Sequence, residues 1–373
     1  MREDNALRVF YSDRFVGTLA MTPDYKTAFQ YSDEWLEKGF SISPFSLPLK
    51  KQVFIPSKDY FDGLFGVFAD SLPDNWGRLL LNRFLRAHKE NPDELTVLDR
   101  LAIVGKSGMG ALTYYPEKGF SQQYEHVNLD ELAEECEKIL NTEYSNKLDE
   151  LYCLGGTSGG ARPKILTAID KEEWIIKFPA HVDGKDAGMM EFDYSRCAEK
   201  CGIVISETRL FPSDKCKGYF GIRRFDRKNG GKRVHMLTAA AILELDFEQP
   251  SLDYHGLMKL TKILTRDNHN DVENMFRRMC FNVFAHNRDD HLKNFTYLYD
   301  EANDSWHLSP AYDLTYSNTY YGEHTTTVDG NGRNPGRKEL LAVGIQAGMK
   351  KDTCEKIMDM IEACVREMLG KYL

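Results

Sequence analysis

One short polar segment, residues 287–294 (Asn-Arg-Asp-Asp-His-Leu-Lys-Asn), constrains the fold and chemistry of this chain more than any other. Asp289 precedes Asn294 by five residues, and Asp313 follows in Ser-Pro-Ala-Tyr-Asp-Leu. Phosphoryl transfer from ATP uses a carboxylate that accepts the proton of the attacking hydroxyl, and then an amide and a second carboxylate that hold magnesium. An ionised carboxylate is already the hard ligand that magnesium prefers. The spacing therefore predicts Asp289 as the catalytic base and Asn294 and Asp313 as magnesium ligands.

A plainer interpretation of this segment is also open. Residues 272–285 carry apolar side chains at helical spacing, and a polar loop has to follow such a helix. Asp289, Asp290 and His291 would then only cap the helix and fill the loop. Short motifs also recur by chance. The downstream aspartate and a lysine on an upstream strand favour the phosphoryl-transfer site.

Composition and charge exclude several protein classes. The 373 residues suffice for two or three domains, and 42% hydrophobic and 28% charged residues are ordinary for a globular protein. The net charge of −9 repels nucleic acid, so any nucleic-acid role needs a local basic patch or a basic partner. No apolar run reaches the length of a membrane span, and the first residues lack the apolar run of a signal peptide. We therefore expect a cytoplasmic protein without a membrane partner.

The eight cysteines are scattered, and none forms a C-x-x-C motif. Cys197 and Cys201 lie one turn apart on an expected helix. Scattered cysteines without a C-x-x-C motif favour buried or free thiols in a reducing cytoplasm over disulfides or a zinc site.

The first part of the chain alternates apolar and polar residues in short runs, which favours a β-rich module. We expect a hairpin over residues 7–20 and strands at 29–32 and 40–43. Two helices should follow, at 76–88 with Ser71 or Asp74 as its cap, and at 93–104.

The segment Gly105-Lys-Ser-Gly-Met-Gly-Ala-Leu resembles a phosphate-binding loop in composition only. Its lysine and serine precede the second and third glycines, whereas a P-loop has the order G-x-x-x-x-G-K-[ST]. A turn into a strand over 111–115 is favoured instead.

Residues 116–150 are acidic and polar, with a helix near 129–140, and should connect two modules. We therefore expect three domains: an N-terminal module over 1–118, a smaller lobe over 150–227 and a helical lobe over 228–373.

A second informative stretch, residues 154–164, has four glycines around Thr157 and Ser158. Glycines let backbone amides approach phosphate oxygens closely. Strands at 165–169 and 174–178 follow, and Lys177 within the second is a candidate phosphate partner. It could instead be a solvent-facing lysine of an edge strand.

An amphipathic helix over 189–201 offers a partner for this lysine. Glu191 near its start could pair with Lys177, with Glu199 as the fallback, or it could only complement the helix dipole.

The remaining elements complete two lobes. We expect a second hairpin over 204–211 and 218–225, then a polar hinge loop over 228–232. Helices should span 237–245, 255–266 and 271–285, a hairpin 295–299 and 306–308, and helices 336–347 and 351–370. Residues 315–335 are polar and suit a substrate-binding or activation loop.

Five motifs in this order resemble the HipA family of bacterial serine/threonine kinases, the toxins of toxin–antitoxin pairs. They are Leu64-Phe-Gly-Val-Phe-Ala-Asp-Ser-Leu-Pro-Asp-Asn-Trp-Gly-Arg, Gly-Gly-Thr-Ser-Gly-Gly-Ala-Arg-Pro-Lys164, Phe225-Asp-Arg, Asn287-Arg-Asp-Asp-His-Leu-Lys-Asn and Pro310-Ala-Tyr-Asp-Leu. The resemblance covers nearly the whole chain. It implies an α+β, bilobal protein-kinase-like fold with a β-rich N-terminal module and a helical C-terminal lobe.

The resemblance also implies ATP and Mg²⁺ as cofactors. It makes Asp289 the base, Asn294 and Asp313 the metal ligands and Lys177 the phosphate lysine. The nucleotide site that it implies comprises the glycine-rich loop, the hinge and the residues beside the metal ligands: Gly159, Gly160, Ala161, Arg162, Pro163, Lys164, Arg223, Arg224, Phe225, His291 and Tyr312. The family autophosphorylates a serine of this loop, and Thr157 and Ser158 both stand near the corresponding position. The pair Arg223-Arg224 departs from the Glu-Arg of one family member.

The implied partners are a protein substrate and a small helix-turn-helix antitoxin that binds the operator, so that DNA is contacted only indirectly. The N-terminal module, residues 1–115, should serve partner binding and lie remote from the catalytic motifs. Two other functions stay open. One is a small-molecule kinase of the aminoglycoside or choline type, which shares the Asp…Asn…Asp set; the other is a catalytically silent binding module.

Overall fold

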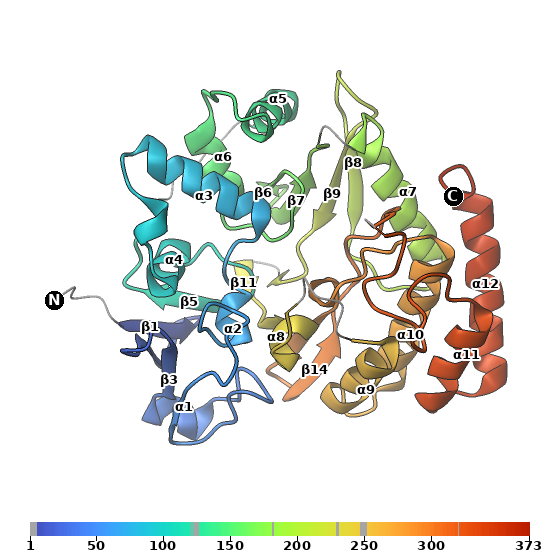
Figure 1. Ribbon diagram of the computed structural model, residues 1–373, viewed down its shortest axis with the longest axis horizontal. Helices are drawn as coiled ribbons and strands as arrows, with labels where there is room; N and C mark the ends of the chain where they lie inside the picture. Colours follow the sequence, from blue (N-terminus) through green and yellow to red (C-terminus); the bar gives the residue numbers. More distant parts are fainter. Residues whose placement is uncertain are drawn as a thin grey trace. The chain divides into compact units, whose positions relative to one another are not determined.

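The protein folds as two compact units, described here from a computed structural model that covers residues 6–120, 122, 127–180, 183–228, 231–246, 252–319 and 321–373 (Figure 1). Unit 1 comprises Met1–Asp186, Phe211–Leu237 and Ala241–Glu244, and unit 2 comprises Ala187–Leu210, Thr238–Ala240 and Leu245–Leu373. Two positions of the expected hinge loop, 229 and 230, and position 320 of the expected activation loop lie outside the described residues. The three-domain division at 118, 150 and 227 stays a prediction.

Unit 1 begins with an antiparallel five-stranded sheet of order β4-β3-β2-β1-β5. In β1, alternate residues Leu7, Val9 and Tyr11 are buried, which is the period of a half-buried strand. The expected hairpin over 7–20 and the strands near 29–32 and 111–115 are confirmed. The strands are β1 (Ala6–Tyr11), β2 (Arg14–Met21), β3 (Thr27–Tyr31), β4 (Val53–Phe54) and β5 (Leu112–Tyr115).

The expected strand over 40–43 is wrong. Ser43 forms only an isolated bridge with Leu47. Side chains take the backbone groups that a neighbouring strand would need: Trp35 Nε1 donates to the Phe40 carbonyl at 2.9 Å, and the Ile42 amide donates to the Tyr31 hydroxyl at 3.1 Å.

Three helices of unit 1, α3 (Asn75–Ala87), α5 (Leu129–Leu140) and α6 (Leu148–Gly155), share one core with a second sheet. In this sheet β7 (Glu172–Lys177) pairs with β6 (Lys164–Ile169) and β9 (Tyr219–Arg223). Trp76 and Phe84 from α3 pack in the same cluster as Tyr152 from α6 and Trp174 from β7. Figure 1 shows α3 and α6 side by side next to β6. This core therefore joins the expected N-terminal module to the expected smaller lobe.

The helices of unit 1 are α1 (Asp33–Lys38), α2 (Gly66–Ala69), α3 (Asn75–Ala87), the 3-10 helix η1 (Pro92–Glu94), α4 (Val97–Val104), α5 (Leu129–Leu140) and α6 (Leu148–Gly155). The expected helix over 93–104 begins four residues late, because Thr96 forms a capping box with Asp99. Helix α6 was not expected. Asp74 is the N-cap residue of α3, but its side chain does not cap that helix.

The later strands of unit 1 are β6 (Lys164–Ile169), β7 (Glu172–Lys177), β9 (Tyr219–Arg223), β10 (Arg227–Lys228) and β11 (Lys232–Arg233). The chain passes between the units in β8 (Thr208–Phe211), β12 (Met236–Thr238) and α8 (Ala239–Leu243). The expected strand over 204–211 begins only at Thr208. Val204 instead accepts a bond from the amide of Ala311 at 2.8 Å.

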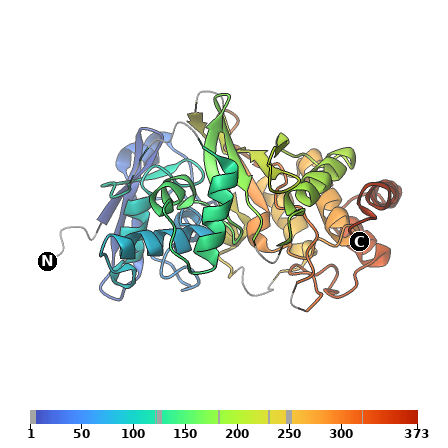
Figure 2. The same ribbon diagram turned by 90° about the horizontal axis from the view of Figure 1, so that it is seen from above.

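Unit 2 is mostly helical, with one hairpin that carries polar loops at its ends. Figures 1 and 2 show α12 beside α10 and α11 within this unit. Its elements are α7 (Ala187–Lys200), α9 (Tyr254–Leu264), α10 (His269–Phe284), the 3-10 helix η4 (Leu292–Asn294), β13 (Thr296–Asp300), β14 (Ser305–Leu308), α11 (Arg337–Gln346) and α12 (Lys351–Leu369). These bounds confirm the expected helices and the hairpin, and the fold class is α+β as expected.

All eight cysteines are free thiols, as expected. The sulfurs of Cys197, Cys201 and Cys364 lie within 4.8 Å of one another in the core between α7 and α12. Among the described residues, none of the helices combines the length and the apolar character needed to cross a bilayer.

Candidate active site

The expected catalytic loop of unit 2, residues 287–294, follows helix α10 and exposes the side chain of the expected base. The side chain of Asp289 is 60% exposed, and its carboxylate lies 4.0 Å from Nε2 of His291. Asn294, at the end of η4, donates from Nδ2 to the Asp289 carbonyl at 2.6 Å. This bond spans the five-residue spacing and leaves the amide oxygen of Asn294 directed elsewhere. The loop therefore holds Asn294 by its amide nitrogen and leaves the Asp289 carboxylate exposed.

The neighbouring residue, Asp290, is a fully buried support for this loop. Its carboxylate accepts from the Tyr254 hydroxyl at 2.9 Å, from Nδ1 of His324 at 2.9 Å and from the Thr326 amide at 3.1 Å. The Thr326 hydroxyl donates to the Asp290 carbonyl at 2.5 Å. A buried carboxylate with these donors fixes the loop backbone, because any displacement would leave a buried charge unpaired.

The support continues from Tyr254 into helix α10. Asn282 donates to the Tyr254 hydroxyl at 2.9 Å, and Asn287 donates to Asn282 at 2.9 Å. Burial and the nearby Asp290 charge raise the pKa of Tyr254 well above its usual value, so this hydroxyl keeps its proton. The plainer interpretation, in which polar side chains only fill the loop, therefore describes Asp290. The side chain of Asp289 is instead 60% exposed.

Asp313 ends a segment that is fixed at its start. The Ala311 amide donates to Val204, and the hydroxyl of Tyr312 donates to the Lys293 carbonyl at 2.5 Å and lies 2.6 Å from the Thr296 hydroxyl. Asp313 itself has a φ of 52°, a left-handed conformation that aspartate adopts more readily than most residues. Asn294 and Asp313 both offer hard oxygen ligands, so this donor set fits Mg²⁺.

The glycine-rich loop of unit 1 is hydrogen-bonded to the start of α3. The Gly160 amide donates to Oδ2 of Asp74 at 3.0 Å, and the Trp76 amide donates to the Gly160 carbonyl at 3.2 Å. Lys164 donates from Nζ to the Gly159 carbonyl at 2.6 Å. The expectation that residues 1–115 lie remote from the catalytic motifs therefore fails at the glycine-rich loop, and it stays a prediction for the motifs of unit 2.

The two hydroxyl residues of this loop differ in accessibility. Ser158 is 1% exposed, and its hydroxyl donates to the Gly155 carbonyl at 2.6 Å. Thr157 is half-buried and donates to the Ser107 carbonyl at 3.1 Å. Ala161 and Arg162 are exposed beyond them, and Arg162 pairs with Asp183 at 2.6 Å.

Lys177 lies at the end of β7, directly opposite Lys164 of β6 in the strand register. Its Nζ is 5.7 Å from the ring centroid of Phe220. Pro163 accepts a bond from the Phe178 amide at 2.8 Å, which ties the end of the loop to this strand. Glu191 is on α7 in unit 2, so its pairing with Lys177 stays a prediction.

The expected hinge begins where β9 ends, and its central side chain is engaged within the fold. Arg224 is buried and pairs with Asp226 at 2.8 Å and with Glu173 at 3.2 Å. Burial alone would raise the pKa of Asp226, but the guanidinium groups of Arg224 and Arg227 outweigh it and hold that pKa at about 2. Arg223 lies 3.8 Å from Glu172, and Phe225 is half-buried. The contact of this hinge with a nucleotide stays a prediction.

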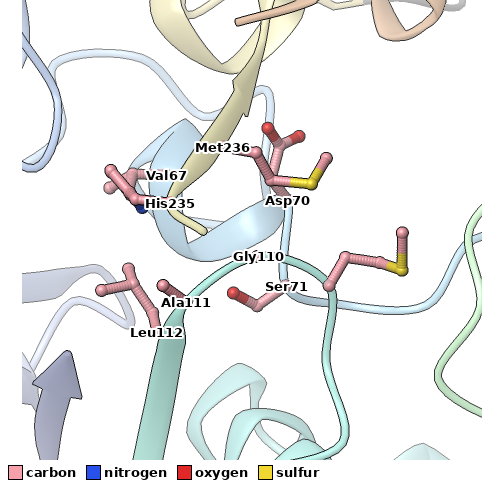
Figure 3. Close-up of a pocket in the computed structure, with 9 residues that line it drawn as sticks. Val67, Asp70, Ser71, Gly110, Ala111, Leu112, His235 and Met236 are labelled. Carbon is pink, nitrogen blue, oxygen red and sulfur yellow. The ribbon is translucent and has the colours of Figure 1, made fainter. Parts of the chain in front are cut away.

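The segment 105–112 is a turn into β5, as favoured over a phosphate loop. Its carbonyl groups accept bonds from Arg227 and Arg233: Gly108 and Gly110 each accept from both residues. The Gly110 amide donates to Asp226 at 2.8 Å. Figure 3 shows a small pocket between this segment and His235 and Met236.

Sequence analysis missed two groups of residues that hold the expected catalytic loop and the glycine-rich loop in place. Tyr254, His324 and Thr326 support the catalytic loop, but they are more than 30 positions from Asp290 and carry no motif. Asp74 was noticed only as a candidate helix cap. The motif Leu-Pro-Asp-Asn-Trp-Gly-Arg around it was a signal that this position has a further role.

Comparisons with known proteins match both parts of the chain to one family. A family model described as HipA N-terminal domain matches residues 7–115, and one described as HipA-like C-terminal domain matches residues 156–368. Among solved structures, the chain is similar to HipA from the Shewanella oneidensis MR-1 complex of HipA, HipB and operator DNA. The TM-score is 0.72 at 18% identity, over 98% of this chain and 90% of that chain. At this identity the similarity shows the fold alone.

Two further similarities are weaker. The Helicobacter pylori proinflammatory kinase CtkA aligns with a TM-score of 0.38 at 12% identity, over 57% of this chain and 88% of that chain, too low to support an argument. A Sinorhizobium fredii protein described as a kinase, Y4dM, is 28% identical over 172 residues, which is 42% of this chain and 40% of that protein.

Proposed function

Because this chain belongs to the HipA family, we propose that it is a serine/threonine-protein kinase that transfers the γ-phosphate of ATP to a protein. The observation that carries the proposal is the catalytic loop, in which an exposed Asp289 is joined to Asn294 by a 2.6 Å hydrogen bond above a buried support. An exposed, rigidly held carboxylate next to oxygen ligands is the arrangement that phosphoryl transfer requires.

In this mechanism Asp289 accepts the proton of the substrate hydroxyl. The hydroxyl oxygen bonds to the γ-phosphorus, the bond from that phosphorus to the β–γ bridging oxygen breaks, and ADP leaves. Asn294 and Asp313 would hold magnesium, which neutralises charge on the phosphates when bound. Lys177 would contact the phosphates, residues 159–164 would cover the nucleotide and the hinge at 223–225 would contact the adenine through backbone groups. His291 and Tyr312 would flank the nucleotide site.

We further propose that the kinase acts in the cytoplasm as a growth-inhibiting toxin. The similarity to a HipA bound to HipB and operator DNA supports a small helix-turn-helix antitoxin as partner, with DNA contacted only through it. Phosphorylation at Ser158 or Thr157 would inactivate the enzyme. A phosphate group there adds nearly two negative charges, which would repel the γ-phosphate and compete for Arg162 and Lys164.

The test uses the purified full chain, labelled ATP and extract proteins as acceptors, with Mg²⁺, Mn²⁺ or EDTA. Transfer should need the metal. Asp289→Ala should lower transfer roughly 10²- to 10⁴-fold and keep nucleotide binding, and Asp313→Ala should weaken metal-dependent nucleotide binding as well. Glu301→Ala, an exposed carboxylate in the β13–β14 turn, is the matched control. Wild-type transfer by Asp289→Ala would show that the base is assigned wrongly.

Two outcomes separate the alternatives. Transfer to an aminoglycoside or choline, with none to protein, would replace the protein kinase by a small-molecule kinase. Mass spectrometry after incubation with ATP should find phosphate on Ser158 or Thr157 in the wild type and none in Asp289→Ala. Full activity of a protein fully phosphorylated at either residue would contradict the inactivation.

A further inference from the structure

The peptide at Gly160 is held from both sides by the start of helix α3. Its amide donates to the Asp74 carboxylate at 3.0 Å, and its carbonyl accepts from the Trp76 amide at 3.2 Å. The indole of Trp76 also donates to the Lys164 carbonyl at 3.1 Å. Three bonds therefore connect a turn of the N-terminal region to a loop more than 80 residues later.

A glycine in α3 makes this close approach possible. A Cβ atom at Gly77 would lie 2.7 Å from Cβ of Pro73, 2.8 Å from the Ser158 carbonyl oxygen and 2.9 Å from the Gly156 carbonyl oxygen, all closer than real contacts allow. Gly77 is in the first turn of α3, where alanine would favour the helix more. Its presence there is explained by the loop backbone that lies against it.

Asp74 makes this contact instead of capping its own helix α3 with its side chain. Its backbone is in the extended N-cap conformation, yet its side chain does not accept from the α3 amides. The carboxylate accepts from the Gly160 amide instead. In a glycine-rich phosphate loop such amides bind phosphate oxygens, so Asp74 supplies a negatively charged oxygen at a donor that ATP would use.

The bound loop also hides a hydroxyl group. Ser158, two residues before Gly160, is 1% exposed, and its hydroxyl is used by the Gly155 carbonyl. A serine must reach a γ-phosphate in line to be phosphorylated. In this conformation the Ser158 hydroxyl cannot do so.

We propose that Asp74 is a latch that holds the glycine-rich loop closed by occupying the Gly160 amide in place of a phosphate oxygen. ATP displaces the carboxylate, the loop leaves the start of α3, and Ser158 becomes accessible. The nucleotide part of this inference rests on the proposed kinase function; the latch itself rests on the contacts within unit 1. Asp74 is a positioning residue in this scheme and touches no reacting atom.

The latch is tested first without nucleotide, by hydrogen exchange of residues 156–162. A hydrogen bond to a charged acceptor is strong enough that Asp74→Ala should speed exchange of the Gly160 amide roughly tenfold or more. Asp93→Ala, another aspartate of the N-terminal region, is the control and should leave that exchange unchanged. Unchanged Gly160 exchange in a folded Asp74→Ala protein would overturn the latch.

Nucleotide titration then tests the competition. Removal of the competing charge should make Asp74→Asn and Asp74→Ala bind Mg-ATP several-fold more tightly and, in both, speed phosphate incorporation at Ser158. Weaker ATP binding with an opened loop would overturn the competition and make Asp74 a support for the binding conformation. If neither wild type nor variants bind ATP, the proposed function fails, and the exchange measurement still decides the latch.

Gly77→Ala provides a second route if the Asp74 variants do not fold. The added methyl group should push the carbonyls of Gly156 and Ser158 away while the Asp74 charge stays and α3 gains helix propensity. Faster hydrogen exchange of residues 156–162 is the expected result. A closed loop in this variant would contradict the packing on which the latch depends.

Discussion

The catalytic loop of unit 2 and the glycine-rich loop of unit 1 are both fixed by a buried or half-buried aspartate, but in opposite ways. In the catalytic loop, Asp290 is buried in the support and its neighbour Asp289 is exposed for chemistry. In the glycine-rich loop, Asp74 binds Gly160, an amide of the kind that a nucleotide would use, and Ser158 is hidden. The first loop therefore exposes its carboxylate to solvent, whereas the second keeps an amide and a hydroxyl group engaged within the fold.

The largest expected effect is a difference in the free energy of unfolding between variants of the adjacent residues Asp290 and Asp289. Asp290→Ala should lower the free energy of unfolding by about 3–5 kcal/mol, because Tyr254, His324 and Thr326 lose a buried charged acceptor. Asp289→Ala, one residue earlier, should leave stability within about 0.5 kcal/mol. Urea denaturation of the two variants measures both values. Equal losses of stability in the two variants would contradict the assignment of Asp290 alone as the residue that supports the loop.

Acid should weaken unit 1 through His235, which is fully buried and donates from Nε2 to the Ile42 carbonyl at 2.8 Å. Burial lowers the pKa of His235 from 6.5 to about 4. The unfolded chain therefore takes up a proton before the folded chain does. Stability from the neutral imidazole is complete above about pH 6.5 and is lost as the pH falls towards 4, by about 2 kcal/mol between pH 7 and 5.

The measurement is the free energy of unfolding of unit 1 across this range, followed by tryptophan fluorescence. His235→Gln should remove most of the slope. A slope that persists in that variant would assign the acid sensitivity to another group.

Asp226 should act in a lower pH range. Its pKa of about 2, against 3.8 for the ordinary group, stabilises the fold by about 2 kcal/mol. Because the folded-state pKa is lowered, this contribution is present above about pH 4 and is lost as the pH falls towards 2. The stability difference between wild type and Asp226→Asn should therefore shrink from pH 5 to pH 2.5, and a constant difference would contradict the ion-pair role.

The smallest effect concerns the left-handed backbone of Asp313. Glycine adopts this conformation without strain, so Asp313→Gly should be about 1 kcal/mol more stable than Asp313→Ala. Both variants should lose metal-dependent nucleotide binding equally. If alanine were as stable as glycine here, the φ of 52° would carry no strain.

The sequence by itself determined the local structure and the chemistry of the reactive groups. Apolar spacing predicted helix α5 with the bounds Leu129–Leu140 that the structure has, and alternation predicted the β1–β2 hairpin. The five-residue spacing of Asp289 and Asn294 is a local relation, since one turn of loop and η4 connects them. Such patterns depend on neighbours along the chain, which a sequence shows directly.

Only the tertiary structure decided which of two adjacent aspartates is buried and which is exposed. Asp289 and Asp290 are adjacent and chemically identical, and they differ because three partners distant in the chain enclose one of them. In the same way Asp74 resembled a helix cap until packing brought Gly160, 86 residues later, within 3.0 Å. A side chain's partner is set by whichever elements pack against it, and spacing along a chain carries no record of that packing.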